Sequence, residues 1–140
     1  MASVIYNNFK KNIMNGNIDL DTNDINVMLV TSSYTPDIDS HEFMSSVTNE
    51  VSGTGYTADG QALASKAVTA DTTDDEGVFD AADLTWSTST ITARGAVLYK
   101  DTGASTTSPL ICYFDFGSDK TSSAGDFTIA WSSEGILNIG

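Results

Sequence analysis

The sequence predicts an all-β domain, an antiparallel β-sandwich of immunoglobulin-like or jelly-roll type with one short N-terminal helix. Thr and Ser account for 18 and 17 of the 140 residues, and these residue types favour strands and turns over helix interiors. About seven short apolar segments alternate with turn-rich stretches, a pattern typical of sandwiches and barrels. The length is that of one domain, so we expect residues 1–140 to form a single unit.

The first segment predicts a short helix or arm over residues 1–16. Ser3 can cap this helix, and Gly16 is a suitable C-terminal stop. A helix of this length is marginal on its own, so its apolar side must pack on its own domain or on a neighbouring subunit. The apolar residues recur every fourth position and form one stripe: Ile5, Phe9 and Ile13.

Seven later segments carry strand patterns, at residues 25–31, 62–69, 78–86, 91–100, 110–116, 127–131 and 136–139. Alternation predicts that three of them each present one apolar face. These faces are Ile91, Ala93, Gly95, Val97 and Tyr99; Leu110, Cys112, Phe114 and Phe116; and Phe127, Ile129 and Trp131. Polar loops join the three segments, which predicts an antiparallel meander over residues 91–131.

A long irregular loop occupies residues 31–60. Loops of nearly 30 residues are uncommon in compact domains and are often functional. Aromatic and Met side chains in such a loop are typical of contact surfaces, although residues folded over a sheet edge would give the same pattern. Together with the helical stripe, these loop residues form the predicted interface: Ile5, Phe9, Ile13, Tyr34, Phe43, Met44 and Tyr56.

The net charge of −13 and the pI of about 4.1 argue against several classes of partner. Nucleic-acid binding needs clustered Lys and Arg, and binding to an anionic membrane needs basic residues as well. No apolar segment is long enough to cross a bilayer. The first ten residues do not have the pattern of a signal peptide, so we expect synthesis and folding in a cytoplasm. Cys112 lies in an apolar run and is expected to be a buried thiol.

Catalytic and metal-binding patterns are sparse, so the sequence predicts no enzyme activity, no metal and no cofactor. His41 is the single His, and no nucleophile elbow accompanies it. One His and one Cys cannot supply the four ligands of a usual zinc site. Two acidic runs, at residues 19–24 and 71–76, are explained as solvated turns, and calcium binding there is left open.

The chain resembles a group of small structural proteins encoded by tailed bacteriophages and prophages. The likeness covers nearly the whole chain, and the order of the matching stretches is specific. These stretches are Ile18–Thr22, Val27–Asp37, Thr48–Tyr56, Val78–Ala81, Trp86, Ile91–Asp101, Tyr113–Asp119, Phe127–Trp131 and Gly135–Leu137.

The resemblance implies a non-enzymatic virion structural protein, and a capsid decoration or cement protein fits best. Such proteins sit on the outer surface of the head, commonly as trimers. The expected partners are therefore the major capsid protein and copies of this chain. The alternative is a tail, baseplate or fibre component, including an adhesion module that binds a host glycan. A carbohydrate-binding module and a small lytic hydrolase are the alternatives from other functional classes.

Overall fold

The structure is a computed structural model that describes residues 2–140, and it confirms an all-β sandwich with one short helix. Helix α1 spans Asn7–Met14, and one 3-10 turn, η1, spans Met44–Ser46. The strands are β1 Val4–Ile5, β2 Ile25–Val30, β3 Gln61–Ala62, β4 Ala67–Asp71, β5 Glu76–Asp80, β6 Leu84–Ser89, β7 Thr92–Lys100, β8 Leu110–Thr121, β9 Gly125–Ile129 and β10 Leu137–Ile139.

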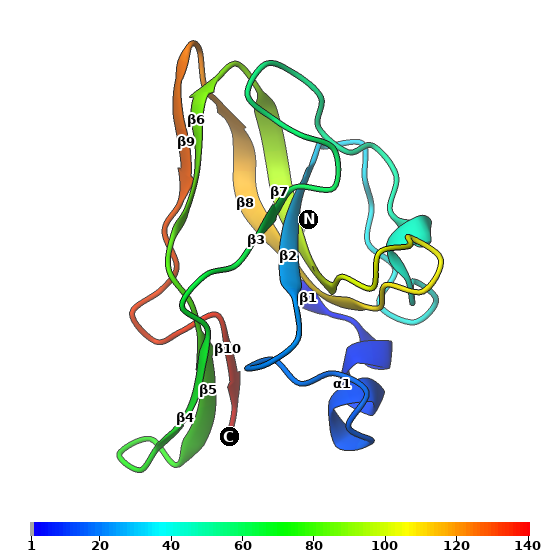
Figure 1. Ribbon diagram of the computed structural model, residues 1–140, viewed down its shortest axis with the longest axis vertical. Coiled ribbons are helices and arrows are strands. Elements are labelled where there is room, and N and C mark those ends of the chain that lie inside the picture. Colours follow the sequence, from blue (N-terminus) through cyan, green and yellow to red (C-terminus); the bar gives the residue numbers. More distant parts are fainter. Residues whose placement is uncertain (1) are drawn as a thin grey trace.

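Two layers enclose the main core (Figure 1). One layer is a five-stranded sheet in the order β1-β8-β7-β2-β3, and the other consists of the pair β6-β9 and the small sheet β10-β5-β4. All pairings are antiparallel. The side chains between the layers are aliphatic and aromatic, and they include Val27, Leu29, Leu98, Ile111, Trp86 and Phe127.

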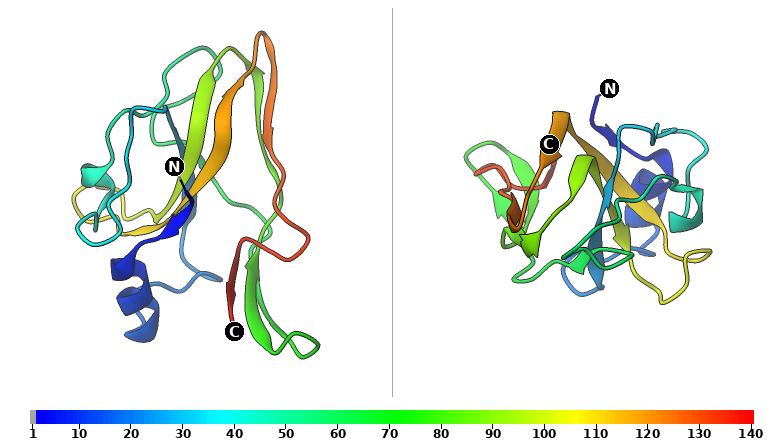
Figure 2. Two further views of the ribbon diagram at one scale, coloured as in Figure 1. Left: turned by 180° about the vertical axis from the view of Figure 1, so that it is seen from behind. Right: turned by 90° about the horizontal axis from the view of Figure 1, so that it is seen from above.

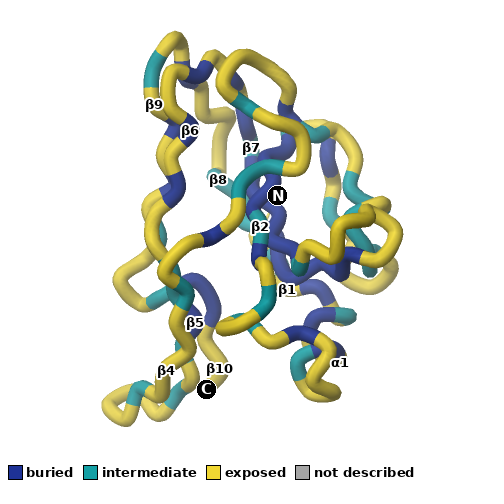
Figure 3. The backbone as a smooth tube through the Cα atoms, viewed as in Figure 1, coloured by how far each residue is buried: buried dark blue, intermediate teal, exposed yellow. Residues whose placement is uncertain are grey.

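A second, smaller core lies on the outer face of the five-stranded sheet. Met28, Val30 and Val97 point to this face and are buried there under the long loop. The loop crosses the sheet without forming a strand, and its backbone pairs with the sheet through isolated bridges such as Val30 to Glu50. Because both faces of β2 and β7 are covered, these strands are buried along nearly all of their length (Figure 3).

The predicted helix is present, but its beginning was wrong. Val4 and Ile5 form strand β1 against β8, and the Ser3 hydroxyl accepts a hydrogen bond from the Asp115 N–H instead of capping a helix. The two β-branched residues here extend the sheet, which gives their backbone groups partners that an isolated helix end lacks. The C-terminal prediction was correct, because Gly16 has a φ of +80° and follows the last turn.

The single strand predicted for residues 78–86 is two strands in separate sheets. Asp80 ends β5, since its carboxylate accepts a hydrogen bond from the next N–H, that of Ala81. Ala82 then donates to the carbonyl oxygen of Ala64. The buried residue of β5 is Phe79, whereas Val78 is only half-buried. The segment predicted at 62–69 is likewise divided, into β3 and β4.

The predicted faces of the two longest strands were wrong in part, because the ladder between β7 and β8 is irregular at two places. Ile91 and Ala93 pack in the main core, but Val97 and Tyr99 pack in the second one. On β8, Leu110 lies in the second core, while Cys112, Phe114 and Phe116 face the main core. An extra residue at a bulge shifts alternation by one and moves the following side chains to the other face.

The predicted meander holds only for its first two strands. β7 and β8 are neighbours, but β9 crosses to the other layer and pairs with β6. Trp86 and Phe127 are cross-strand partners in that pair, and their rings meet edge to face at 6.2 Å. Burying both rings between the layers favours this crossing over continued pairing with β8.

Candidate interaction surface

The small sheet β10-β5-β4 has one fully apolar face. Cross-strand partners share a face, and the register places Val68, Phe79 and Leu137 in one row. The next row on this face contains Ala70, Gly77 and Ile139. The opposite face carries polar side chains, among them Thr69, Asn138 and Asp80. This two-faced pattern is typical of a sheet that packs on another surface.

Only part of that apolar face is covered. Phe79 and Leu137 are buried, but Val68 is 53% exposed and Ile139 is 63% exposed. The small sheet and α1 project from the same end of the molecule, as the views from the front and from behind show (Figures 1 and 2). The outer half of the sheet therefore extends past the main core.

An apolar groove of about 110 Å³ separates this face from the N-terminal segment. Ile5, Phe9 and Leu20 line the groove opposite the small sheet. Five large apolar residues are exposed among residues 2–140, and three of them, Ile5, Val68 and Ile139, line this groove. Scattered exposed apolar residues are normal, whereas a contiguous group marks a contact surface. The groove, defined by these residues, is the candidate interaction surface.

Acidic side chains lie next to the groove residues in the chain. Exposed Asp19 and Asp21 flank Leu20, and Glu76 precedes Gly77. At the tip of the β4–β5 hairpin, the carboxylates of Asp71, Asp74 and Glu76 lie within 4.8 Å of one another. Cations are also close in the chain: Lys10 is beside Phe9, with its Nζ donating to the Asn7 side chain, and Lys66 precedes β4. By the strand register Asp71 and Glu76 lie on the polar face of the small sheet, where Glu76 accepts a hydrogen bond from Asn138, and no charged residue lines the groove itself.

The structure distributes the predicted interface residues over several places. Ile5 and Phe9 line the groove, and Ile13 packs against the main core. Tyr34 is 1% exposed and can contact no partner in this conformation. Phe43 and Met44 are half-buried where the loop meets the hairpin between β7 and β8; Met44 donates its N–H to the Ser108 carbonyl oxygen.

Tyr56 is held inside the fold by three contacts. Its ring lies 6.1 Å from that of Trp86. Its hydroxyl donates to Glu50 and accepts a hydrogen bond from the Leu29 N–H. Like Tyr34, it stabilises the loop against the sheet. Tyr34 and Tyr56 therefore fold over the sheet, which was the alternative to their forming a contact surface.

His41 is half-buried and belongs to a hydrogen-bonded cluster within the long loop. Its Nδ1 accepts from the Asp37 N–H and lies 2.9 Å from the Tyr34 hydroxyl. Because Nδ1 is the acceptor, Tyr34 donates to His41 and accepts from Tyr6, whose hydroxyl is 2.7 Å away. Burial raises the pKa of both tyrosines. The chain of bonds joins the N-terminal segment to the long loop.

The acidic runs form turns. Asp19 Oδ1 accepts the N–H groups of Asp21 and Thr22, and hydrogen bonds from Thr22 hold the pKa of Asp19 below its usual range. Asp71 Oδ1 accepts the N–H groups of Thr73 and Asp74 in the same way. These are the turn-forming bonds that Asp makes readily, which agrees with the interpretation of both runs as turns.

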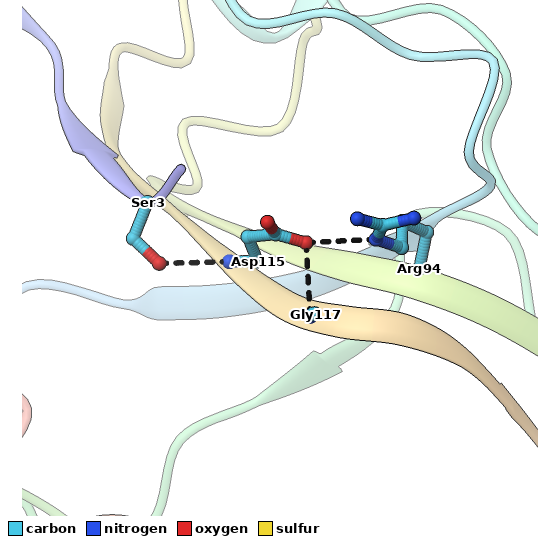
Figure 4. A network of polar contacts seen from close by, with 4 residues as sticks. All are labelled: Ser3, Arg94, Asp115 and Gly117. Atoms are coloured by element: carbon cyan, nitrogen blue, oxygen red, sulfur yellow. Dashed lines mark hydrogen bonds and ion pairs between the residues drawn. The ribbon is translucent and has the colours of Figure 1, made fainter. Parts of the chain in front are cut away.

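Arg94 and Asp115 form the shortest ion pair of the described chain, with Nε and Oδ1 2.8 Å apart (Figure 4). The same carboxylate oxygen accepts the Gly117 N–H, and the Asp115 N–H donates to Ser3. The pair therefore connects three segments at the edge of the five-stranded sheet. These bonds explain why Arg94 stands in the middle of an apolar strand.

Sequence reasoning missed the part of the groove formed by Val68 and Ile139. The alternation of Val68 with Ala70, and of Leu137 with Ile139, was the available signal. It was weak because each of these strands is short and is interrupted by polar residues.

No helix within residues 2–140 has the length and apolar character needed to cross a membrane. A scan against protein-family models, a search of curated proteins and a search of solved structures each find no match to this chain.

Proposed function

We propose that the protein is a non-enzymatic structural protein of a bacteriophage virion and that it decorates the outer surface of the capsid. The observation that carries this proposal is the open groove, where exposed Ile5, Val68 and Ile139 meet. A contiguous apolar surface of this kind is a cost to an isolated domain and an advantage to one that binds a partner. The groove thus supports a function exerted through binding.

The resemblance to small structural proteins of tailed phages supports the same proposal, because it extends over nearly the whole chain. The charge of −13 also suits an outer layer. Particles coated with an acidic protein repel one another and stay dispersed. The proposed partners are the major capsid protein and other copies of this chain, as a homotrimer at local symmetry axes. Symmetry multiplies the modest contact area of each copy.

The roles of the carboxylates support a non-enzymatic function. Asp19, Asp37, Asp71 and Asp101 each accept backbone N–H groups of their own turn. Asp115 is engaged by Arg94 and Gly117. Carboxylates used in this way hold turns and strands in place, which accounts for them without a catalytic role.

Cosedimentation with capsids tests the proposal. Purified protein would be mixed with emptied, expanded capsids that lack it, taken from the parent phage, alongside purified tails and host cells. We expect saturable binding to tailless capsids at a stoichiometry that matches a local symmetry axis. Binding to tails or host cells without binding to capsids would instead establish the alternative, a tail, baseplate or fibre component. Failure to bind any of the three would refute a virion role.

A further inference from the structure

Strand β4, Ala67–Asp71, forms the free outer edge of the small sheet. It pairs with β5 on one side, and no strand of residues 2–140 pairs with its other side (Figure 1). Natural edge strands are usually protected by a charge, a proline or a bulge, because their unpaired N–H and C=O groups can pair with another chain. The first four residues of β4, Ala-Val-Thr-Ala, are exposed and have none of these features, and their ladder with β5 is regular. This edge is therefore open to a further strand.

We propose that β4 pairs antiparallel with β4 of a second copy of this chain, about a two-fold axis. Full overlap of the two strands places Thr69 opposite Thr69 of the second copy and Val68 opposite its Ala70. Cross-strand partners share a face, so the half-exposed Val68 gains an apolar neighbour and the two threonines meet on the polar face. The small sheets of both copies would then form one continuous sheet. The same strand serves both copies, as a two-fold contact requires.

The charges at the two ends of β4 match in this antiparallel arrangement. Lys66 precedes the strand and belongs to neither of the ion pairs found within residues 2–140. At the opposite end, the carboxylates of Asp71, Asp74 and Glu76 lie within 4.8 Å of one another. Antiparallel pairing places Asp71 of one copy opposite Ala67 of the other, next to Lys66. Each lysine therefore lies beside the acidic turn of the second copy, and this charge complementarity favours a second copy as the occupant.

The net charge of −13 opposes association of two copies, but the antiparallel direction limits this opposition. At about 3.4 Å per residue, the turns at residues 72–75 of the two copies lie roughly 30 Å apart, which exceeds the Debye length of about 10 Å at 0.1 M salt. Parallel pairing would bring these turns side by side. Asp80, the β5 partner of Ala67, also lies at the Lys66 end, where its carboxylate accepts the Ala81 N–H.

A contact between two short strands is small, so we expect weak association in solution. It becomes effective where many copies are held close together, because the effective concentration is then high. The inference goes beyond the proposed function and does not require it. On a capsid, this two-fold contact would join copies of neighbouring homotrimers, because a three-fold contact within one trimer cannot be two-fold symmetric.

Disulfide cross-linking tests the predicted register. Thr69 lies on the proposed axis, where the facing Cα atoms of an antiparallel pair are about 4.5–5.5 Å apart, within the range of a disulfide. Thr69→Cys should therefore form covalent dimers at least about tenfold faster than Ser87→Cys, which places a thiol at an exposed position on β6. The native Cys112 is buried and should not contribute. Equal rates for the two variants would overturn the inference.

Charge variants test the orientation. Lys66→Glu should weaken association about fivefold, measured by cross-linking of Thr69→Cys and by sedimentation equilibrium of the chain with native Thr69. Lys120→Glu on β8 is the matched control, because it makes the same change in net charge away from β4. Adding Asp74→Lys to Lys66→Glu should restore association, since the exchanged charges face each other again, whereas adding Asp126→Lys on β9 should not.

Sedimentation equilibrium of the wild type supplies the remaining result. A mass that rises with concentration, and rises less for Lys66→Glu than for Lys120→Glu, supports the β4 contact. A constant mass up to about 1 mM, or association that Lys66→Glu leaves unchanged, overturns it. None of these assays uses capsids, so their failure leaves the proposed function standing. Conversely, dimers through β4 in a protein that does not bind capsids would refute only the proposed function.

Discussion

The Nε atom of Arg94 lies 2.8 Å from Oδ1 of Asp115, and the pair joins β7 to β8 where the ladder between them is irregular. Asp115 is the cross-strand partner of Gly95, the residue after Arg94. The same carboxylate also accepts the N–H of Gly117, which has a φ of +82°. One carboxylate therefore bonds to both β7 and β8 at the place where their register is irregular.

The first prediction concerns the pH dependence of this ion pair. The bond from Arg94, followed by that from Gly117, holds the pKa of Asp115 below its ordinary value. A carboxyl group with a depressed pKa stabilises the fold above its unfolded pKa of about 4, and this contribution is lost as the pH falls through the lower folded pKa. Asp115→Asn should therefore lower the urea midpoint at pH 7, and the difference from wild type should shrink below about pH 4.

Asp126→Asn is the control for that experiment, because Asp126 is an exposed carboxylate on β9. It should leave the urea midpoint nearly unchanged across the pH range. A midpoint for Asp115→Asn equal to that of wild type at pH 7 would show that the ion pair contributes nothing to stability.

Replacing Tyr by Phe should affect stability differently at two positions, because one tyrosine hydroxyl has a hydrogen-bond partner and the other does not. The Tyr6 hydroxyl is buried and bonded to Tyr34, so Tyr6→Phe should reduce the free energy of unfolding by about 1 kcal/mol. The Tyr113 hydroxyl is buried without a hydrogen-bond partner within the described residues. Tyr113→Phe should leave stability unchanged or raise it, because it removes an unsatisfied polar atom. Chemical denaturation of both variants measures this, and a larger loss for Tyr113→Phe would contradict the structure.

Two glycines with positive φ form a matched pair. Gly103 has a φ of +90° and open space around it, so Gly103→Ala should cost only about 1 kcal/mol of backbone strain. Gly60 has a φ of +84°, and a Cβ there would collide with the Val27 carbonyl group on β2. Gly60→Ala should cost about 3 kcal/mol, because overpacking adds to the strain. Equal melting temperatures for the two variants would argue against this close approach.

The buried tyrosines predict a cooperative unfolding at alkaline pH. Burial raises the pKa of all five tyrosines, that of Tyr99 to about 12. Groups with raised pKa values stabilise the fold fully below their unfolded pKa of about 10, and this stability is lost as the pH rises toward the folded values. Tyrosinate absorbance should therefore increase together with the loss of the strand signal in circular dichroism. Independent titration near pH 10 with the strand signal intact would contradict the burial.

Composition and local periodicity determined the fold class. The high Thr and Ser content and the apolar run of β2 correctly indicated an all-β chain, because strand preference and alternation act over a few neighbouring residues. The helix end at Gly16 was also predictable, since a positive φ after a helix is a local requirement. The irregular character of residues 31–60 followed from the same local signals.

Only the tertiary structure decided which surfaces are buried. Bulges between β7 and β8 move some of the side chains predicted for one core to the other core. The loop buries Tyr34, a residue of the predicted interface, against the outer face of the five-stranded sheet. Of the predicted interface, Ile5 and Phe9 line the groove, while Val68 and Ile139 join them from distant parts of the chain. The physical reason is that strand pairing and burial depend on contacts far apart in sequence, which alternation along one segment does not encode.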